Sequence, residues 1–176
     1  MKTSIALIGF MGTGKTVVGK ALAQRLSREF IELDSLVELK AGKTIPQIFL
    51  QEGEIAFREL EIKVTKEIAL RSNTVIACGG GVVLNKINID RLRQKCAVIL
   101  LTASPDVILK RTSTDKNERP LLMASDKARK IGELIRFRQP LYERAAEIKV
   151  DTSKININTV TEQIISNLEL DENFSF

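Results

Sequence analysis

Short apolar runs alternate with longer amphipathic stretches along most of the chain. Five of the runs have the length of a β-strand: Ile5–Ile8, Phe30–Leu33, Thr74–Ala77, Ala97–Leu101 and Ile148–Val150. The fourth is continuously apolar, which is typical of a parallel strand buried on both faces. Strands that alternate with helical patterns predict an α/β fold, with a five-stranded parallel sheet flanked by helices.

The stretches between these runs carry helical periodicity and residues that begin or end helices. We expect longer helices over 15–28, 54–70, 89–95, 126–146 and 159–168, and one more that is capped by Ser104. The segments Ser35–Glu38 and Thr44–Gln47 have the capping-box pattern, so a helix should begin at each. Gly42 and Gly53 are expected to end these two helices.

A chain of 176 residues is long enough for one domain with one sizeable core. We expect that domain to span 1–170 and the last six residues, 171–176, to be a frayed tail. Residues 112–124 are polar and rich in helix breakers, which indicates a mobile loop.

The composition limits the catalytic chemistry, the cellular compartment and the ligands that we expect. The chain has no histidine, which excludes imidazole acid–base catalysis and histidine-ligated zinc. Its two cysteines, Cys78 and Cys96, are far apart, which favours a reducing compartment without a disulfide framework. No leader pattern and no apolar run of bilayer length is visible, so we expect a cytoplasmic protein that does not bind membranes. The net charge of +5 suits either nucleic acid or a small anionic ligand.

The motif Gly9–Thr16 reads G-x-x-x-x-G-K-T and lies between the first strand and a predicted helix. In that context the pattern is typical of a P-loop, whose backbone N–H groups and helix N-terminus bind nucleotide phosphates. Lys15 is expected to reach the β- and γ-phosphates, and the Thr16 hydroxyl to bind Mg²⁺. A glycine-rich turn before an ordinary helix is the less informative alternative.

Two acidic residues lie where the second strand ends. Asp34 can contact a substrate hydroxyl or act as a general base, or it can be a capping or surface carboxylate. Glu32 can reach Mg²⁺, directly or through water, or can face solvent. Many P-loop proteins place an aspartate at the end of the third strand to assist the metal, and here Cys78 stands in that position.

Two features suggest where an anionic substrate binds. Arg58 lies one helical turn after Glu54, so it can form an ordinary i,i+4 ion pair or a bidentate clamp on a carboxylate. The triplet Gly79–Gly81 can be a plain turn, although three successive glycines suggest a close approach of a ligand to the backbone.

Three further arginines could serve a phosphate or a carboxylate. Arg119 lies in the breaker-rich loop and can neutralise a transferring phosphoryl group or be merely exposed. Arg138 precedes Pro140, which we expect to interrupt the long helix, and it can bind an anion or lie on a solvated helix face. Arg111 ends a helix, where it can stack on a base or cap the helix.

Taken together and in this order, the motifs closely resemble those of shikimate kinases. They are GFMGTGKT at Gly9–Thr16, Asp34, Phe57-Arg58, Gly79–Gly81, Arg119-Pro-Leu-Leu and Arg138-x-Pro-Leu-Tyr142. The resemblance runs from the first strand to about Asp151-Thr152. It implies the fold of nucleoside monophosphate kinases, with strand order 2-3-1-4-5, a substrate-binding helical region at about 34–61 and a lid at about 112–124.

The resemblance also implies an activity: ATP-dependent phosphorylation of the 3-hydroxyl of shikimate, on the route to chorismate and aromatic amino acids. The implied catalytic residues are Lys15, Asp34 and Arg119, and the implied shikimate-binding residues are Asp34, Arg58, Gly80 and Arg138. The implied ATP-binding residues are Gly12, Thr13, Gly14, Lys15, Thr16, Val17, Arg111 and Arg119. Magnesium would be held by Thr16 and Glu32. The family commonly has aspartate at the position of Glu32. Phe49 and Phe57 would shape the pocket wall, Ser153–Asn156 would border the adenine, and the protein would be a monomer.

Other functions fit the residues less well. A gluconate or nucleotide kinase would share the P-loop, but Asp34 with Arg58 and Arg138 favours a hydroxylated carboxylate. A GTP-dependent switch would need Asn-Lys-x-Asp and Asp-x-x-Gly, and neither occurs. A nucleic-acid-binding module is suggested only by the positive charge, and one tyrosine without tryptophan provides little stacking surface.

Overall fold

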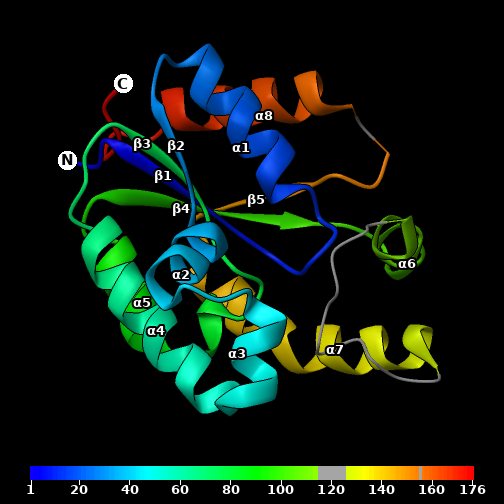
Figure 1. Cartoon of the computed structure of the whole chain (residues 1–176). Coiled ribbons are helices and arrows are strands. Elements are labelled where there is room, and N and C mark those ends of the chain that lie inside the picture. Colours follow the sequence, from blue (N-terminus) through cyan, green and yellow to red (C-terminus); the bar gives the residue numbers. More distant parts are fainter. Residues whose placement is uncertain (115–125, 155) are drawn as a thin grey trace.

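The computed structural model describes residues 1–114, 126–154 and 156–176. Its centre is a sheet of five parallel strands in the order β2-β3-β1-β4-β5 (Figure 1). The strands are β1 (Ser4–Ile8), β2 (Glu29–Glu32), β3 (Thr74–Ala77), β4 (Cys96–Thr102) and β5 (Ile148–Asp151). The strand order and the flanking helices confirm the predicted fold.

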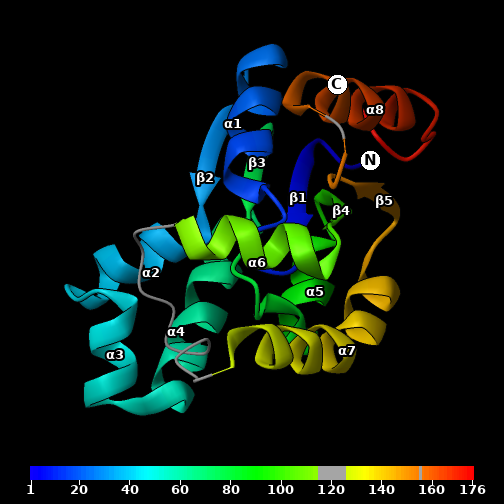
Figure 2. The same cartoon turned by 90° about the vertical axis from the view of Figure 1, so that its right-hand side faces the viewer.

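Helices cover both faces of the sheet (Figures 1 and 2). On one face lie α1 (Lys15–Arg25) and α8 (Ile157–Glu169), and on the other lie α4 (Gly53–Ile68), α5 (Lys86–Leu92) and α7 (Lys127–Ala145). An apolar core lies on each face of the sheet, and alternate residues of β1 point into one or the other. Ile5 and Leu7 pack in one core, and Ala6 and Ile8 pack in the other. This double burial is why the strand appears in the sequence as a continuous apolar run.

The remaining helical elements gather near the carboxyl ends of the strands. They are α2 (Leu33–Ala41), α3 (Ile45–Gln51), the short 3₁₀ turn η1 (Val82–Leu84) and α6 (Pro105–Thr114). Among the described helices, none is long and apolar enough to cross a membrane.

The predicted helix starts were only partly correct. At Thr44 the capping box is present, since Thr44 Oγ1 accepts from the Gln47 amide at 3.4 Å and Gln47 Oε1 accepts from the Thr44 amide at 2.9 Å. The expected box at Ser35 is wrong, because α2 begins at Leu33, directly after β2. Ser35 Oγ instead donates to Glu32 Oε2 at 3.3 Å.

The outcome at three other helix bounds is mixed. Gly53 follows Gln51 and Glu52 at the end of α3 and has a positive φ of 83°, so it ends that helix as expected, and α4 begins at Gly53 itself. Pro140 does not interrupt α7, which continues to Ala145. Residues 112–114, expected in a mobile loop, form the last part of α6, where Thr112 Oγ1 donates to the Ile108 carbonyl at 2.8 Å. The rest of the expected lid, 115–124, lies outside the described residues.

The last residues, for which we expected a frayed tail, pack against the start of the chain. The Lys2 amide donates to the Asn173 carbonyl and the Ser175 amide to the Lys2 carbonyl, each at 2.8 Å. Phe174 is buried in the core that contains Ile5 and Leu7. The C-terminal segment therefore fixes the backbone that leads into β1.

Candidate active site

The loop between β1 and α1 has the backbone that a phosphate-binding loop requires. Gly9, Gly12 and Gly14 have φ values of 142°, 80° and 93°. At Gly9 any side chain is excluded, because a Cβ would lie 2.2 Å from the Leu101 carbonyl oxygen. No side chain caps α1 at Gly14, so the first N–H groups of this helix are available to an anion.

Lys15 lies over the same loop. Its ammonium donates to the Gly9 and Phe10 carbonyls at 2.9 and 3.0 Å. Thr13 Oγ1 also donates to the Phe10 carbonyl, at 2.8 Å. The loop backbone is thus fixed by side chains of the motif itself, with a cation at its centre. Val17, one of the expected nucleotide contacts, is half exposed at the start of α1.

The residues expected to hold magnesium meet at the junction of α1 and β2. Thr16 Oγ1 donates to Glu32 Oε1 at 2.5 Å, so a hydroxyl and a carboxylate oxygen lie together beside the P-loop. This pair fits Mg²⁺, which takes oxygen ligands and usually completes its shell with nucleotide phosphates and water. The described residues contain no cluster of three or more Cys, Asp or Glu side chains suited to a metal.

Cys78 does not take over the role of the aspartate that it replaces. The side chain is buried at the end of β3, and desolvation raises the pKa of the thiol well above its ordinary value. A neutral thiol is a poor ligand for a hard cation such as Mg²⁺. Magnesium binding by the oxygens of Thr16 and Glu32 stays a prediction.

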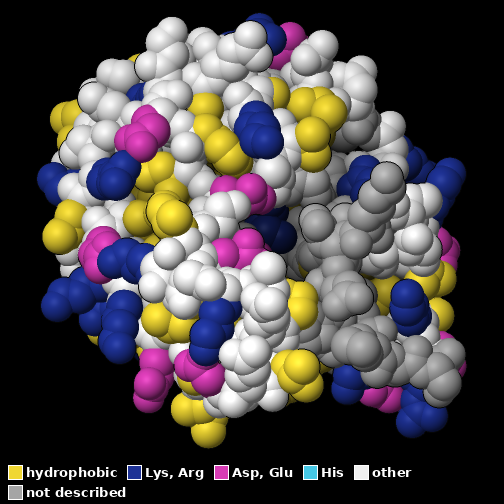
Figure 3. All heavy atoms as spheres, in the orientation of Figure 1, with side chains coloured by type: hydrophobic (Ala, Val, Ile, Leu, Met, Phe, Trp, Pro, Cys, Tyr) yellow, Lys and Arg dark blue, Asp and Glu magenta, His cyan; other side chains and the backbone are white. Residues whose placement is uncertain are grey.

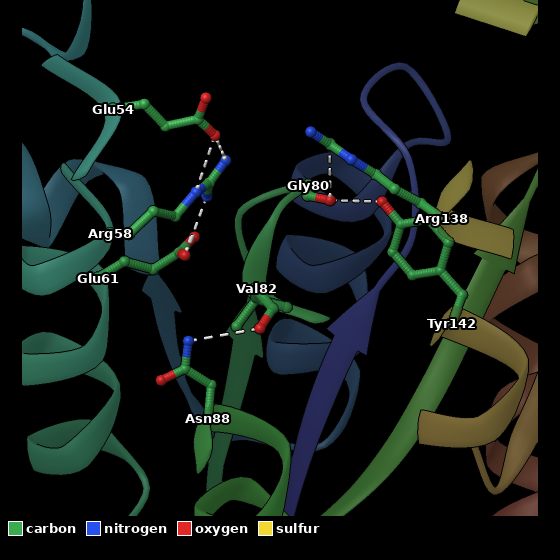
Figure 4. Close-up of polar contacts among 8 residues, drawn as sticks. All are labelled: Glu54, Arg58, Glu61, Gly80, Val82, Asn88, Arg138 and Tyr142. Carbon is green, nitrogen blue, oxygen red and sulfur yellow. Dashed lines mark hydrogen bonds and ion pairs between the residues drawn. The ribbon is translucent and has the colours of Figure 1, made fainter. Parts of the chain in front are cut away.

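Arg58 forms the expected i,i+4 ion pair and a second contact that the sequence did not indicate, and its clamp on a ligand carboxylate stays a prediction. Its Nε and Nη2 donate to Glu54 Oε1 at 3.2 and 2.9 Å, which is the i,i+4 ion pair. Its Nη1 donates to Glu61 Oε2 at 3.0 Å (Figure 4). Two carboxylates therefore fix the guanidinium, whose remaining N–H donors can serve a ligand.

The glycine triplet after β3 makes room for side chains as well as for backbone. A Cβ on Gly81 would lie 2.2 Å from Arg58 Nη1, and a Cβ on Gly79 would lie 2.5 Å from Asp34 Oδ1. Glu61 Oε1 would be 3.1 Å from that second Cβ. The structure thus places Asp34, Glu61 and Arg58 around one glycine-lined turn. Side chains at positions 79 and 81 would collide with these residues, so a turn with a single glycine would not fit.

Glu61 is a site residue that the sequence analysis missed. Its side chain is fully buried, and desolvation raises its pKa, with Arg58 acting in the opposite direction and Asp34 in the same one. Oε1 has no hydrogen-bond partner among the described residues. The available signal was a glutamate on the apolar face of α4, three residues after Arg58 and between Phe57 and Val64.

Arg138 approaches the same turn from α7. It is only 3% exposed, so the alternative of a solvated helix face is wrong. Its Nη1 donates to the Gly80 carbonyl at 3.3 Å, and the Tyr142 hydroxyl donates to the same oxygen. Burial raises the pKa of Tyr142 to about 12, so this donor keeps its proton at any physiological pH. Figure 4 shows the two arginines on opposite sides of the triplet, with the Arg138 guanidinium pointing toward the Arg58 side.

Arg111 contacts the P-loop, a role that neither alternative from the sequence described. Its Nη1 donates to the Gly12 carbonyl and to Thr152 Oγ1, both at 3.1 Å, and its Nη2 donates to the Thr152 carbonyl at 2.9 Å. The guanidinium therefore joins α6 to the P-loop and to the end of β5. Its contact with a base stays a prediction.

The other expected pocket residues are only partly placed. The Phe49 and Phe57 rings pack against each other with centroids 5.1 Å apart, and Phe57 belongs to the core. In the segment expected to border adenine, Ser153 Oγ accepts from the Ser104 amide at 2.8 Å. Arg119 lies outside the described residues. Figure 3 shows the face that is turned to the viewer in Figure 1, and acidic and basic side chains lie close together in its middle.

Comparison with known proteins agrees with this geometry. The family model described as shikimate kinase matches residues 11–169. A shikimate kinase of Pelotomaculum thermopropionicum is 46% identical over 162 residues, covering 92% of this chain and 93% of the relative. A shikimate kinase of Caldanaerobacter subterraneus is also 46% identical, covering 92% and 94%.

A solved structure is similar over almost the whole chain. The shikimate kinase of Acinetobacter baumannii, in complex with shikimate, superposes with a TM-score of 0.93 at 37% identity and covers 98% of this chain and 96% of its own. The family model and the relatives both match over most of this chain. The chain belongs to the shikimate kinase family.

Proposed function

We propose that this protein transfers the γ-phosphoryl group of ATP, with Mg²⁺, to the 3-hydroxyl of shikimate, giving shikimate 3-phosphate and ADP. The reaction lies on the route to chorismate and the aromatic amino acids. One observation carries the proposal: Arg58 and Arg138 converge on Gly80–Gly81, next to Asp34. This triplet adjoins the P-loop, since a Cβ on Gly80 would lie 3.5 Å from the Met11 amide nitrogen.

The charges suit the substrate. Shikimate is a small polyhydroxylated carboxylate, so the carboxylate would pair with Arg58 and Arg138, and a hydroxyl would bind Asp34. The Gly80 N–H would also face the substrate, within a binding region of about residues 34–61 and the glycine triplet. Asp34 would hold the attacking hydroxyl in line with the γ-phosphorus and accept its proton.

The nucleotide would occupy the P-loop. The N–H groups of the loop and of the start of α1, together with Lys15, would hold the phosphates and neutralise charge that develops on the transferring group. Thr16 and Glu32 would hold Mg²⁺, Glu32 directly or through water, and the metal would supply further positive charge at the β- and γ-phosphates. We also infer that the protein is cytoplasmic, since both of its cysteines, Cys78 and Cys96, are unpaired, and that it acts as a monomer.

The test of the acceptor is ADP release from ATP and Mg²⁺ with shikimate, beside quinate, gluconate, AMP and a reaction without acceptor. We expect turnover with shikimate far above all the others. Turnover with another acceptor would preserve the kinase assignment and overturn the substrate. ADP release that needs no acceptor would indicate a nucleotidase and overturn the proposal.

The role of Gly81 provides a second test. In Gly81→Ala the new methyl group would displace the Arg58 guanidinium, because a Cβ there lies 2.2 Å from Nη1. We expect KM for shikimate to rise about tenfold, which corresponds to about 1.4 kcal/mol of lost binding, while KM for ATP stays unchanged. Steady-state kinetics with each substrate varied in turn measures both constants.

Gly132→Ala is the matched control. Gly132 lies within α7, and a Cβ there has no atom within 4 Å. Both kinetic constants should stay at their original values in this variant. If Gly81→Ala also left KM for shikimate unchanged, Arg58 would not be a carboxylate ligand in this position.

A further inference from the structure

Thr152 follows β5 and lies behind the P-loop, where its hydroxyl connects separate parts of the nucleotide-binding end. Thr152 Oγ1 lies 2.9 Å from the Thr13 carbonyl and 3.0 Å from the Thr102 carbonyl at the end of β4, and it can donate to either. It also accepts from Arg111 Nη1 at 3.1 Å. The side chain is 4% exposed, so these bonds form away from solvent.

These contacts address a general requirement of a phosphate-binding loop. When successive N–H groups point toward the phosphates, the carbonyls of the same peptides point the other way, and a buried carbonyl needs a donor. Here the Gly12 carbonyl accepts from Arg111 at 3.1 Å, and the Thr13 carbonyl lies 2.9 Å from Thr152 Oγ1, the shorter of that hydroxyl's two carbonyl contacts. Two consecutive peptides in the middle of the loop are thus held from behind by residues far away in the sequence.

The two donors are themselves joined. Arg111 donates to both the hydroxyl and the carbonyl of Thr152, so the guanidinium depends on Thr152 for its orientation. Loss of the Thr152 hydroxyl would therefore remove one loop contact directly and weaken the other. It would also leave the buried Thr13 carbonyl without this donor, which favours rotation of the peptide that connects Thr13 to Gly14.

We propose that Thr152 is a positioning residue for the nucleotide: its hydroxyl fixes the P-loop peptides at Gly12 and Thr13, directly and through Arg111, so that the Gly14 N–H and the N–H groups that begin α1 face the phosphates. The inference rests on the proposed use of ATP. In this role Thr152 contacts neither ATP nor the acceptor. Loss of its hydroxyl should weaken nucleotide binding and lower the rate of transfer, and acceptor binding at Gly79–Gly81 should be unaffected.

The test compares Thr152→Val, which keeps the shape and removes the hydroxyl, with Thr152→Ser, which keeps the hydroxyl. Binding of ADP with Mg²⁺ is measured by isothermal titration calorimetry, and KM for ATP, KM for shikimate and kcat by ADP release. We expect Thr152→Val to weaken ADP binding about tenfold, to raise KM for ATP and to lower kcat. KM for shikimate should stay within twofold of its original value, and Thr152→Ser should restore ADP binding.

Thr161→Val is the matched control. Thr161 is also buried, and its hydroxyl donates to a backbone carbonyl, that of Ile157, at 2.8 Å, but within α8 and away from the loop. We expect this variant to bind ADP as the original protein does, and its thermal midpoint shows what loss of a buried hydroxyl does to stability.

Either of two results would overturn the inference. One is ADP binding in Thr152→Val that matches the original protein. The other is a parallel loss of ADP affinity and shikimate affinity together with a large fall in the thermal midpoint, which would indicate a purely structural role. The calorimetric measurement needs no acceptor, so a wrong acceptor assignment would leave the ADP result interpretable. A protein whose original form binds no ADP would instead refute the proposed use of ATP.

Discussion

Lys15→Ala should lower the rate of phosphoryl transfer at least about a thousandfold, a loss comparable with that of other cations at a transferring phosphoryl group. Lys15 is the cation at the centre of the P-loop, where its ammonium lies 2.9 Å from the Gly9 carbonyl. The transition state of the transfer spreads negative charge over the γ-phosphoryl oxygens, and a fixed ammonium stabilises that charge without reorganising. The measurement is kcat from ADP release at saturating ATP and shikimate.

Two comparisons make this result specific. Lys15→Met keeps most of the side-chain volume without the charge, and we expect the same fall in kcat, with a thermal midpoint close to that of the original protein. Lys20→Ala removes another lysine from the same helix, whose ammonium lies 5.8 Å from the Phe30 ring centroid, and should leave kcat unchanged. A Lys15 variant that turned over at more than a tenth of the original rate would contradict the role.

Asp34→Asn is the change for which we expect the second largest effect, a fall in kcat of about a hundredfold to ten-thousandfold. Asp34 lies in the first turn of α2, next to Gly79, where we propose that the acceptor binds. Asparagine has almost the same shape but cannot accept the proton of the attacking hydroxyl. Because the substitution also removes a negative charge that raises the pKa of buried Glu61, it should not reduce stability through that neighbour.

The readouts separate binding from chemistry. Isothermal titration with shikimate measures how much Asp34 contributes to binding, and single-turnover formation of ADP measures the transfer step. Asp90→Asn is the control, since Asp90 is a surface carboxylate paired with Lys86 at 2.6 Å. If the transfer step in Asp34→Asn ran at the original rate, Asp34 would have no part in activating the hydroxyl.

Much of the fold could be predicted because the sheet is buried on both sides. Strand β3 was predicted at its observed bounds, Thr74–Ala77, and β4 was one residue short at each end. The P-loop was recognisable because its function depends on local backbone geometry and on adjacent residues. The start of α2 was not predictable in the same way, because Leu33 is fully buried and its packing outweighs a capping pattern at Ser35.

The parts of the site that depend on tertiary contacts were harder to predict. The sequence pointed to Asp34, Arg58, Gly80 and Arg138, which the structure brings together at the glycine triplet, but it did not indicate the contacts that hold them. Glu61 looks like any helical glutamate until packing buries it against Gly79. Likewise, the Arg111 contact with the Gly12 carbonyl joins residues 99 positions apart, which no local pattern specifies. The roles of these residues in substrate binding stay predictions.

The pairing of Lys2 with Asn173 and Ser175 has a consequence for how the chain could be rearranged. The two ends of the chain lie beside each other, next to the amino end of the central strand β1, whereas the P-loop follows its carboxyl end (Figure 1). A short flexible linker could therefore join Phe176 to Met1, and the chain could be reopened at the exposed Gly42, between α2 and α3. Such a circular permutant would keep every strand pairing, and α2 and α3 would carry the new ends.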